Sequence, residues 1–251
     1  MFITGASAGF GAACARIFAT KGNRLILTAR RKDLLLKLQE ELAAVPEVEV
    51  HIIPLDVSDR EAVRGAIESL PERFRAIDVL LNNAGLALGL EPAHQADLDD
   101  WDTMVDTNIK GLMYCTRFVL PGMVERNCGH IINVSSTAGA WPYPGGNVYG
   151  GTKAFVTQFS RNLRCDLSGT RVRVSCIQPG MAETEFSKVR FKGNDKQAAS
   201  VYHGTEPLTA EDIAETVRWI TSQPPHVNVN TIELMSIDQT WGPFAIHREQ
   251  K

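Results

Sequence analysis

"ITGASAGFG", residues 3–11, places Gly5, Gly9 and Gly11 directly after the first apolar residues and before a helical stretch at residues 12–19. Glycines let the backbone turn tightly and approach a pyrophosphate, and the N-terminus of the following helix supplies free N–H groups and a positive dipole end. The spacing G-x-x-x-G-x-G is a variant of the dinucleotide-binding fingerprint. The stretch therefore indicates either a phosphate-binding loop or a purely structural turn between a strand and a helix.

Six further runs have the length and pattern of β-strands. They are NRLILTA (23–29), VEVHIIPL (48–55), IDVLLN (77–82), GHIINVS (129–135), VRVSCIQ (172–178) and VNVNTIELM (227–235). The nearly all-apolar runs suit a sheet that is covered on both faces. Helical patterns separate the runs. We therefore expect an α/β fold: a single-domain, Rossmann-like, doubly wound parallel β-sheet with helices on both faces, spanning residues 1–251.

Two kinds of signal mark the helices between these strands. Leu34, Leu38 and Leu42 recur every four residues, with Leu35 alongside, and form one apolar stripe. Ser58 with Glu61, and Thr209 with Asp212, have the spacing of capping boxes ahead of apolar helical patterns. These signals predict helices that begin near residues 59 and 210.

Length and composition limit the classes of function. The chain has 251 residues, 44% hydrophobic and 22% charged, which suffices for a sizeable core. The net charge of −3, without a basic stripe, argues against nucleic acid as a partner. There is neither a run of 18 apolar residues nor a signal-peptide pattern, so no membrane span is expected. Scattered cysteines and histidines predict reduced thiols in a cytoplasmic protein and no metal site.

The end of the second predicted strand favours a phosphorylated cofactor. An acidic residue about 20 residues after the glycines normally binds the ribose of NAD, whereas an arginine suits the 2′-phosphate of NADP. Here the strand ends TARRK, with Arg30 and Arg31 and no carboxylate before Asp33. Ser7 in the glycine loop can add a hydroxyl group to the same phosphate. We therefore predict NADP, against the alternative that two exposed arginines only solvate a helix start.

Small and polar residues follow the predicted strands at LDVS (55–58), NNAG (82–85), SSTAG (135–139) and QPGMAET (178–184). Ligands of open α/β sheets bind at the carboxyl ends of the strands, so these segments outline a cleft. The residues predicted to bind the cofactor are Gly5, Ser7, Gly9, Phe10, Gly11, Arg30, Arg31, Asp56, Val57, Asn83, Ala84, Gly85, Tyr149, Lys153, Pro179, Gly180, Met181 and Thr184.

Together these segments resemble the short-chain dehydrogenase/reductase family over essentially the whole chain. The motifs that carry the resemblance are TGASAGFG, NNAG, Asn108 in DTNIKG, Ser136 in NVSSTAG, Tyr149 and Lys153 in YGGTK, and QPGMAET. More narrowly, NNAGLALGLEPAH, VLPGMVERN, GHIIN, STAG, WPYPGGNVYG and TEFSKVRFKG resemble the NADP-dependent 3-hydroxy acid dehydrogenase branch.

The resemblance to this branch implies a function. It implies reversible oxidation of serine, allo-threonine or 3-hydroxypropionate, the last of these to malonic semialdehyde, by a cytoplasmic homotetramer. It also implies a segment at about residues 181–206 that covers the substrate. Two alternatives stay open. One is a carbonyl reductase of another substrate class, and the other is a non-catalytic sensor that binds NADP(H).

The resemblance implies that Asn108, Ser136, Tyr149 and Lys153 are catalytic. Residues four apart on a helix share one face, so Lys153 can approach the hydroxyl of Tyr149. A positive charge about 5 Å away, at an effective dielectric constant of about 20, lowers the pKa of a tyrosine by roughly two units. Tyr149 is then the base, and the resemblance implies that Ser136 binds the carbonyl oxygen. In the family pattern, Asn108 holds a water that relays protons to Lys153, and Thr184 binds the carboxamide. Gly150 and Gly151 indicate either that the cofactor, a strand or another subunit approaches the backbone closely, or sequence drift without a structural role.

The substrate end is predicted from the basic segment SKVRFK. Lys188, Arg190 and Lys192 point the same way if the segment is extended, and less so if it is helical. Arg190 suits a substrate carboxylate through a bidentate pair, unless the segment is only a solvated loop. Ser136, Tyr149 and Arg190 are the predicted substrate-binding residues. Trp141, Pro142 and Tyr143 either wall a pocket or form a packed loop, and residues 238–251 either contact another subunit or cover the pocket.

Overall fold

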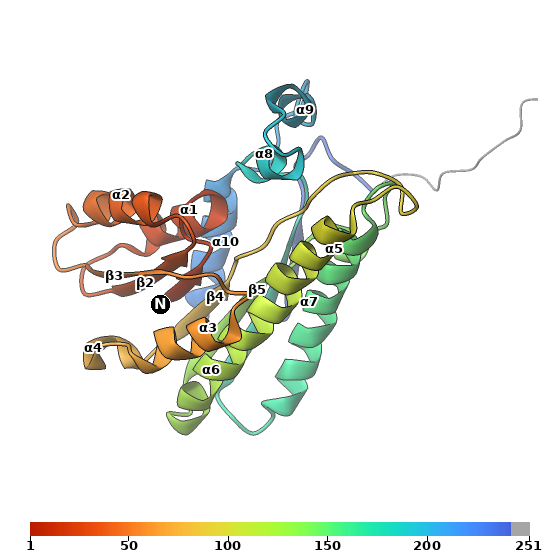
Figure 1. Cartoon of the computed structure of the whole chain (residues 1–251). Helices are drawn as coiled ribbons and strands as arrows, with labels where there is room; N and C mark the ends of the chain where they lie inside the picture. The colour runs from red at the N-terminus through yellow and green to blue at the C-terminus, as the bar shows by residue number, and fades with distance from the viewer. Residues whose placement is uncertain (242–251) are drawn as a thin grey trace, which may run out of the picture.

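The computed structural model describes residues 1–241 and contains one seven-stranded parallel β-sheet (Figure 1). The strands are β1 Phe2–Thr4, β2 Arg24–Ala29, β3 Glu49–Pro54, β4 Val79–Asn82, β5 Gly129–Val134, β6 Val172–Pro179 and β7 Thr231–Leu234. Their order is β3-β2-β1-β4-β5-β6-β7, and each neighbouring pair is parallel. The predicted doubly wound α/β fold is confirmed.

Helices cover both faces of this sheet. On one face lie α1 Gly9–Phe18, α2 Lys32–Leu42 and α10 Ala210–Thr221, and on the other lie α3 Arg60–Glu68, α6 Leu112–Glu125 and α7 Asn147–Asp166 (Figure 1). Alternate strand residues feed the two cores: Ile3 and Leu81 pack with the first set of helices, and Phe2 and Leu80 with the second. A strand that is apolar on both faces is therefore required in the middle of the sheet.

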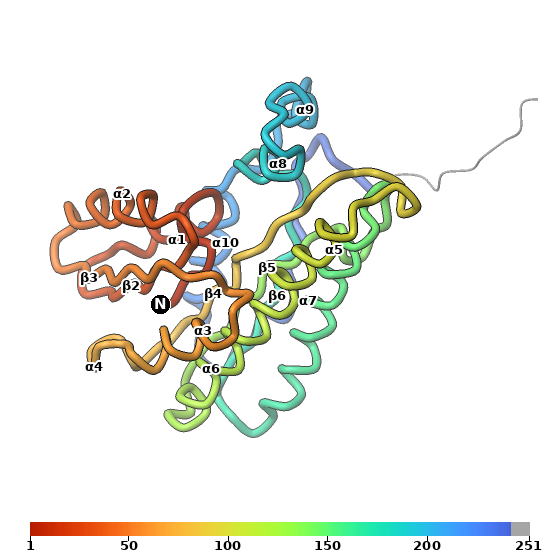
Figure 2. Tube along the Cα trace, viewed as in Figure 1, coloured from red at the N-terminus to blue at the C-terminus, as the bar shows by residue number. Residues whose placement is uncertain are grey.

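The remaining helical elements are short, or interrupt longer ones. They are α4 Glu72–Arg75, α5 Leu98–Val105, a π-helical turn at Asp106–Gly111, a 3-10 turn at Thr137–Gly139, α8 Phe186–Arg190 and α9 Asp195–Ser200. The π-helical turn joins α5 to α6 without a break, as the Cα trace shows (Figure 2). None of the helices in the described part of the chain combines the length and hydropathy needed to cross a membrane.

One of the two predicted capping boxes is confirmed and the other is wrong. Thr209 caps α10: its hydroxyl accepts from the Asp212 backbone N–H, while the Asp212 carboxylate accepts from the Thr209 backbone N–H. Ser58 does not cap α3. Its hydroxyl donates to Asp56 at 2.7 Å, and the Asp59 carboxylate instead accepts from two backbone N–H groups of the first turn. The cap therefore lies one residue later than predicted, because Asp56 engages the serine.

The 181–206 segment follows β6 and carries α8 and α9 above the carboxyl edge of the sheet (Figure 1). It is tied down at both ends of α8: Ala182 forms a bridge with Leu208, and Lys192 pairs with Asp100 at 2.8 Å. Because α8 is helical, the three basic side chains of SKVRFK do not share one direction. Lys188 is exposed and lies 3.8 Å from Asp195, whereas Arg190 points inward.

Only residues 238–241 of the C-terminal segment, which was predicted to contact another subunit or to cover the pocket, are described. Trp241 is described, and its ring lies 5.6 Å from that of Trp141. Phe244 and Ile246, on which the prediction also rested, lie outside the described residues.

Candidate functional site

A cleft of about 680 Å³ opens at the carboxyl edge of the sheet. It lies beside β1, which pairs with both β2 and β4 and is therefore the point where the strand order reverses. All predicted cofactor residues except Gly11 line this cleft. Ser136 and Arg190 line it too, as do Trp141, Pro142 and Tyr143, which therefore form a pocket wall.

The glycine loop closes one side of the cleft through its backbone. Gly5 has a φ of +66° and Gly9 a φ of +51°, conformations that favour glycine. Gly9 also begins α1, whose N-terminus therefore faces the cleft. Gly11 lies behind the loop, and a Cβ there would come within 2.5 Å of the Gly5 carbonyl oxygen. Gly11 therefore allows close packing of the helix against the loop, and its predicted part in cofactor binding stays a prediction.

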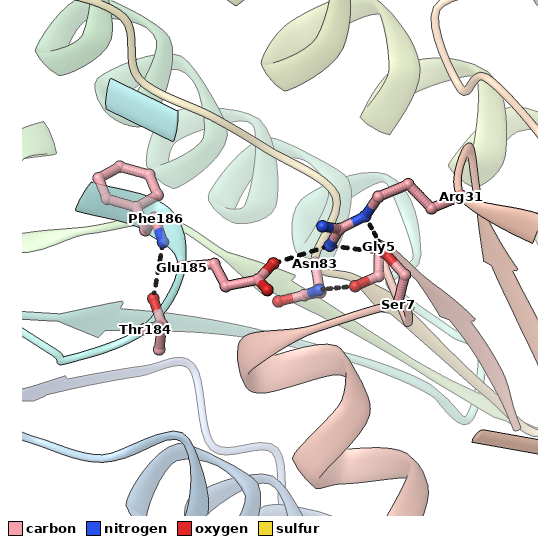
Figure 3. A network of polar contacts seen from close by, with 7 residues as sticks. All are labelled: Gly5, Ser7, Arg31, Asn83, Thr184, Glu185 and Phe186. Atoms are coloured by element: carbon pink, nitrogen blue, oxygen red, sulfur yellow. Dashed lines mark hydrogen bonds and ion pairs between the residues drawn. The ribbon is translucent and has the colours of Figure 1, made fainter. Parts of the chain in front are cut away.

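The two arginines after β2 line the same side of the cleft. The Arg31 guanidinium donates to Ser7 Oγ through Nε at 3.3 Å and through Nη2 at 3.1 Å (Figure 3). Its Nη2 also pairs with Glu185 Oε2 at 2.9 Å. The charge of Arg30 acts on Asp56, whose carboxylate accepts from the Ser58 hydroxyl. The structure thus brings Ser7 and Arg31 together as predicted, and adds a carboxylate that sequence reasoning missed.

Tyr149 and Lys153 lie one turn apart on α7, and both are buried. Lys153 Nζ is 5.8 Å from the centroid of the Tyr149 ring and donates to the Val134 carbonyl oxygen at 2.9 Å. Burial lowers the pKa of Lys153 to about 8 and raises the pKa of Tyr149 to about 12. The predicted net lowering of the tyrosine pKa by Lys153 is therefore wrong for this arrangement, because the cost of burying a phenolate is larger than the charge effects that oppose it.

Two other groups oppose the effect of burial on the pKa of Tyr149. A hydrogen bond with Ser136 lowers its pKa, and so does the positive charge of Arg190. Ser136 stands after β5, where its hydroxyl also reaches the Pro179 carbonyl oxygen at 3.3 Å and accepts from the Ala138 backbone N–H. The predicted serine and tyrosine thus meet in the cleft, and the second cation at the tyrosine is Arg190.

Asn108 lies in the π-helical turn and does not line the cleft. Its side-chain amide donates to the Leu86 carbonyl oxygen at 2.8 Å and to Thr152 Oγ1 at 3.0 Å, and its oxygen accepts from the Leu86 N–H at 2.9 Å. The side chain therefore clamps the segment after β4 to α7. The predicted catalytic role of Asn108, a water relay to Lys153, stays a prediction beside this positioning role.

Arg190 lies beside Tyr149 in the cleft. Its guanidinium lies 5.1 Å from the Tyr149 ring centroid and 5.3 Å from that of Phe186, and its Nη2 donates to the Tyr143 hydroxyl at 2.7 Å. Its Nε is buried, with no hydrogen-bond partner within residues 1–241. A half-buried arginine with a free, buried Nε–H beside Tyr149 is suited to an anionic group on a small ligand.

Sequence reasoning missed several cleft residues. Glu185 and Phe186 come from the 181–206 segment, and Phe186 packs its ring 5.6 Å from that of Tyr149. Gln239 accepts from the Met181 N–H at 2.6 Å and so holds the turn after β6. No spacing in the sequence links residue 185 to residue 31, or residue 239 to residue 181, so these contacts had no local signal.

The arrangement can orient a small anionic alcohol or carbonyl compound for proton transfer. Tyr149 and Ser136 offer hydroxyl groups at one point, and Arg190 offers a cation next to it. The remainder of the cleft, from the glycine loop to Arg31, carries donors suited to a phosphorylated dinucleotide.

Comparison with known proteins agrees with this geometry. The model of the short chain dehydrogenase family matches residues 1–195. The NADP-dependent 3-hydroxy acid dehydrogenase YdfG of Salmonella typhi is 56% identical over 249 residues, which cover 99% of each chain. Sulfoacetaldehyde reductase 2 of Chromohalobacter salexigens is 52% identical over 99% of this chain and 98% of its own. The closed form of a serine dehydrogenase complexed with NADP+ superimposes with a TM-score of 0.94 and 54% identity, covering 99% of both chains.

Proposed function

The chain belongs to the short-chain dehydrogenase family, and from this premise we propose that it is an NADP-dependent oxidoreductase acting on a small 3-hydroxy acid. The proposed reaction converts the 3-hydroxyl group to a carbonyl group and back, with serine, allo-threonine and 3-hydroxypropionate as candidate substrates. The observation that carries the substrate class is Arg190, a half-buried residue beside Tyr149 whose buried Nε–H is free.

The residues of the cleft fit NADP. The left-handed backbone at Gly5 and Gly9 brings main-chain N–H groups to the N-terminus of α1, where a pyrophosphate is stabilised. Arg31 and Ser7 form a ready-made pair of donors for the 2′-phosphate. We propose that Asp56, Val57 and the NNAG segment hold the adenosine half of the cofactor, and that Lys153, Thr184 and the Pro179–Met181 turn hold the nicotinamide half.

The reaction then follows from the groups around Tyr149. NADP+ bound in the cleft would supply the acceptor for the hydride from the carbon that bears the hydroxyl group. Tyr149 takes the hydroxyl proton, and Ser136 donates a hydrogen bond to the developing carbonyl oxygen. Arg190 stabilises the phenolate form of Tyr149 by charge and orients the substrate by its anionic end. Asn108 positions the segment after β4 against α7.

The names of two similar proteins support a pocket that binds an anionic group of the substrate. One is named for 3-hydroxy acids and the other for sulfoacetaldehyde, so the two names share a small substrate with an anionic group. Either a carboxylate or a sulfonate can accept from Arg190. We propose the carboxylate, because the more similar of the two relatives carries that name. The 181–206 segment, which brings Arg190 into the cleft, is the proposed cover of the substrate.

The test is NADPH formation from NADP+ with a 3-hydroxy acid and, in parallel, with its methyl ester. We expect kcat/KM for the acid to exceed that for the ester by about 10- to 100-fold, the range for a hydrogen bond to a charged group. Arg190→Met should remove this difference. Lys188→Met is the matched control, because Lys188 lies two residues away on α8 and outside the cleft lining, so it should keep the difference. Equal rates for acid and ester would instead indicate a general carbonyl reductase.

We propose that the enzyme is a cytoplasmic homotetramer. The five cysteines, Cys14, Cys115, Cys128, Cys165 and Cys176, are free in the structure, which suits a reducing compartment. A solution mass equal to one chain would exclude the tetramer.

A further inference from the structure

Arg31 is held between two parts of the molecule that are far apart in the sequence. Its Nε and Nη2 donate to Ser7 of the glycine loop, and Nη2 also pairs with Glu185 of the 181–206 segment at 2.9 Å (Figure 3). The ion pair thus spans the cleft, from the start of α2 to the residue that precedes α8. The edge of the guanidinium that carries Nε and Nη2 is engaged by Ser7 and Glu185.

Glu185 belongs to the segment that also touches the catalytic end. Thr184 lies against the glycine loop, 3.5 Å from the position of a Cβ on Gly9, and its hydroxyl accepts from the Phe186 N–H at 3.2 Å. Phe186 packs against the ring of Tyr149. Three consecutive residues therefore contact the glycine loop, the phosphate end and the catalytic tyrosine, and Figure 3 shows the side chain of Glu185 reaching toward Arg31.

A cofactor phosphate and Glu185 have the same chemistry toward Arg31. A phosphate monoester carries a charge of about −1.5 to −2 near neutral pH and prefers a bidentate guanidinium. The Glu185 carboxylate already lies on this guanidinium, and a carboxylate beside a phosphate repels it. NAD(H) lacks the 2′-phosphate, so the Arg31–Glu185 pair presents no conflict to it.

We propose that Glu185 is a determinant of cofactor selectivity, because its carboxylate competes with the 2′-phosphate of NADP(H) for the guanidinium of Arg31. This inference rests on the proposed use of NADP(H). Glu185 then weakens the preference for the phosphorylated cofactor, whereas Arg31 and Ser7 strengthen it. Binding of NADP(H) then separates Glu185 from Arg31, and so couples the phosphate end to the base of the 181–206 segment.

The experiment is a fluorescence titration of the wild type and of Glu185→Gln with NADPH and with NADH. We expect the Kd for NADPH to fall by about two- to fivefold in Glu185→Gln, the range for one half-exposed charge pair, with the Kd for NADH unchanged. Competition by 2′,5′-ADP and by 5′-AMP should repeat this contrast with fragments that lack the nicotinamide. Glu183→Gln is the matched control: it removes the same charge two residues away, on an exposed side chain outside the cleft lining, and should change neither Kd.

Each contrary result identifies what fails. If Glu185→Gln binds NADPH as the wild type does, or more weakly, Glu185 does not compete with the phosphate and the inference is overturned. An equal gain for NADH and NADPH also overturns it, since the effect would not depend on the phosphate. If the wild type itself binds NADPH no more tightly than NADH, the proposed cofactor preference fails first. Thermal unfolding of both variants verifies that they are folded.

Discussion

Two cations occupy opposite ends of the same cleft in opposite surroundings. Lys153 is 5% exposed and donates to a backbone carbonyl oxygen, and burial lowers its pKa to about 8. The Arg31 side chain is 48% exposed and pairs with a carboxylate that is 51% exposed. The charge of the buried cation therefore depends on pH, whereas the exposed cation is governed by which anion accepts its hydrogen bonds. Substitutions at the buried end should accordingly have the larger effects.

The largest effect is expected at the hydroxyl group of Tyr149. Tyr149→Phe should lower kcat by about 10²- to 10⁴-fold, the usual contribution of a general acid–base group, while NADPH still binds. Tyr143→Phe is the matched control, because it removes another cleft hydroxyl, the one that accepts from Arg190. Steady-state rates and NADPH titration on the same preparations test this. Unchanged turnover in Tyr149→Phe would exclude this residue as the base.

The second effect concerns the protonation of Lys153. Its pKa is about 8 in the folded protein and 10.5 as a free side chain, so between these values the unfolded chain binds the additional proton. Stability contributed by this group therefore rises with pH from 8 to 10.5 and is lost as pH falls through 8.

The measurement is the difference in unfolding free energy between the wild type and Lys153→Met across that range. The difference should grow in favour of the wild type by up to about 3 kcal/mol, at about 1.4 kcal/mol per pH unit. Burial raises the pKa values of Cys14 and Cys115 to about 12, so these thiols lower stability as pH rises. Both proteins contain these thiols, and their contribution therefore cancels in the difference. Lys196→Met, which removes a lysine at an exposed position of α9, is the matched control. A flat difference for Lys153→Met would show that this lysine is not desolvated.

The smallest effect is expected at Gly150 and Gly151, which lie between Tyr149 and Lys153 on α7. A Cβ on Gly151 meets no atom within 4 Å, so Gly151→Ala should stabilise α7 by up to about 1 kcal/mol. A Cβ on Gly150 would lie 3.0 Å from the Ala138 carbonyl oxygen, and Gly150→Ala should gain less or lose stability. Urea unfolding of both variants tests the pair. Destabilisation by Gly151→Ala would point to a neighbouring subunit at this helix face.

The sequence predicted well what the backbone determines locally. The strands, the glycine loop, the spacing of Tyr149 and Lys153 and the Thr209–Asp212 capping box all depend on residues close in the chain, and all are found in the structure. Glycines and apolar runs carry this information directly, because they set backbone conformation and burial.

The sequence could not predict what depends on long-range side-chain contacts. Glu185 pairs with Arg31, 154 positions away in the sequence. Ser58 does not cap α3, because its hydroxyl donates to the Asp56 carboxylate instead. The pKa of Tyr149 depends first on burial, which a spacing of four residues does not reveal. The direction of Arg190 required the helical form of α8, which the basic pattern alone left open.

The most direct test of the proposed reaction uses a 3-hydroxy acid that carries deuterium on the carbon bearing the hydroxyl group. The wild type is incubated with this acid and NADP+, and the reduced cofactor is analysed by mass spectrometry. We expect one deuterium in the nicotinamide of the product, together with a rate that is slower than with the unlabelled acid. Reduced cofactor without deuterium, or no reduction with any 3-hydroxy acid, would contradict it.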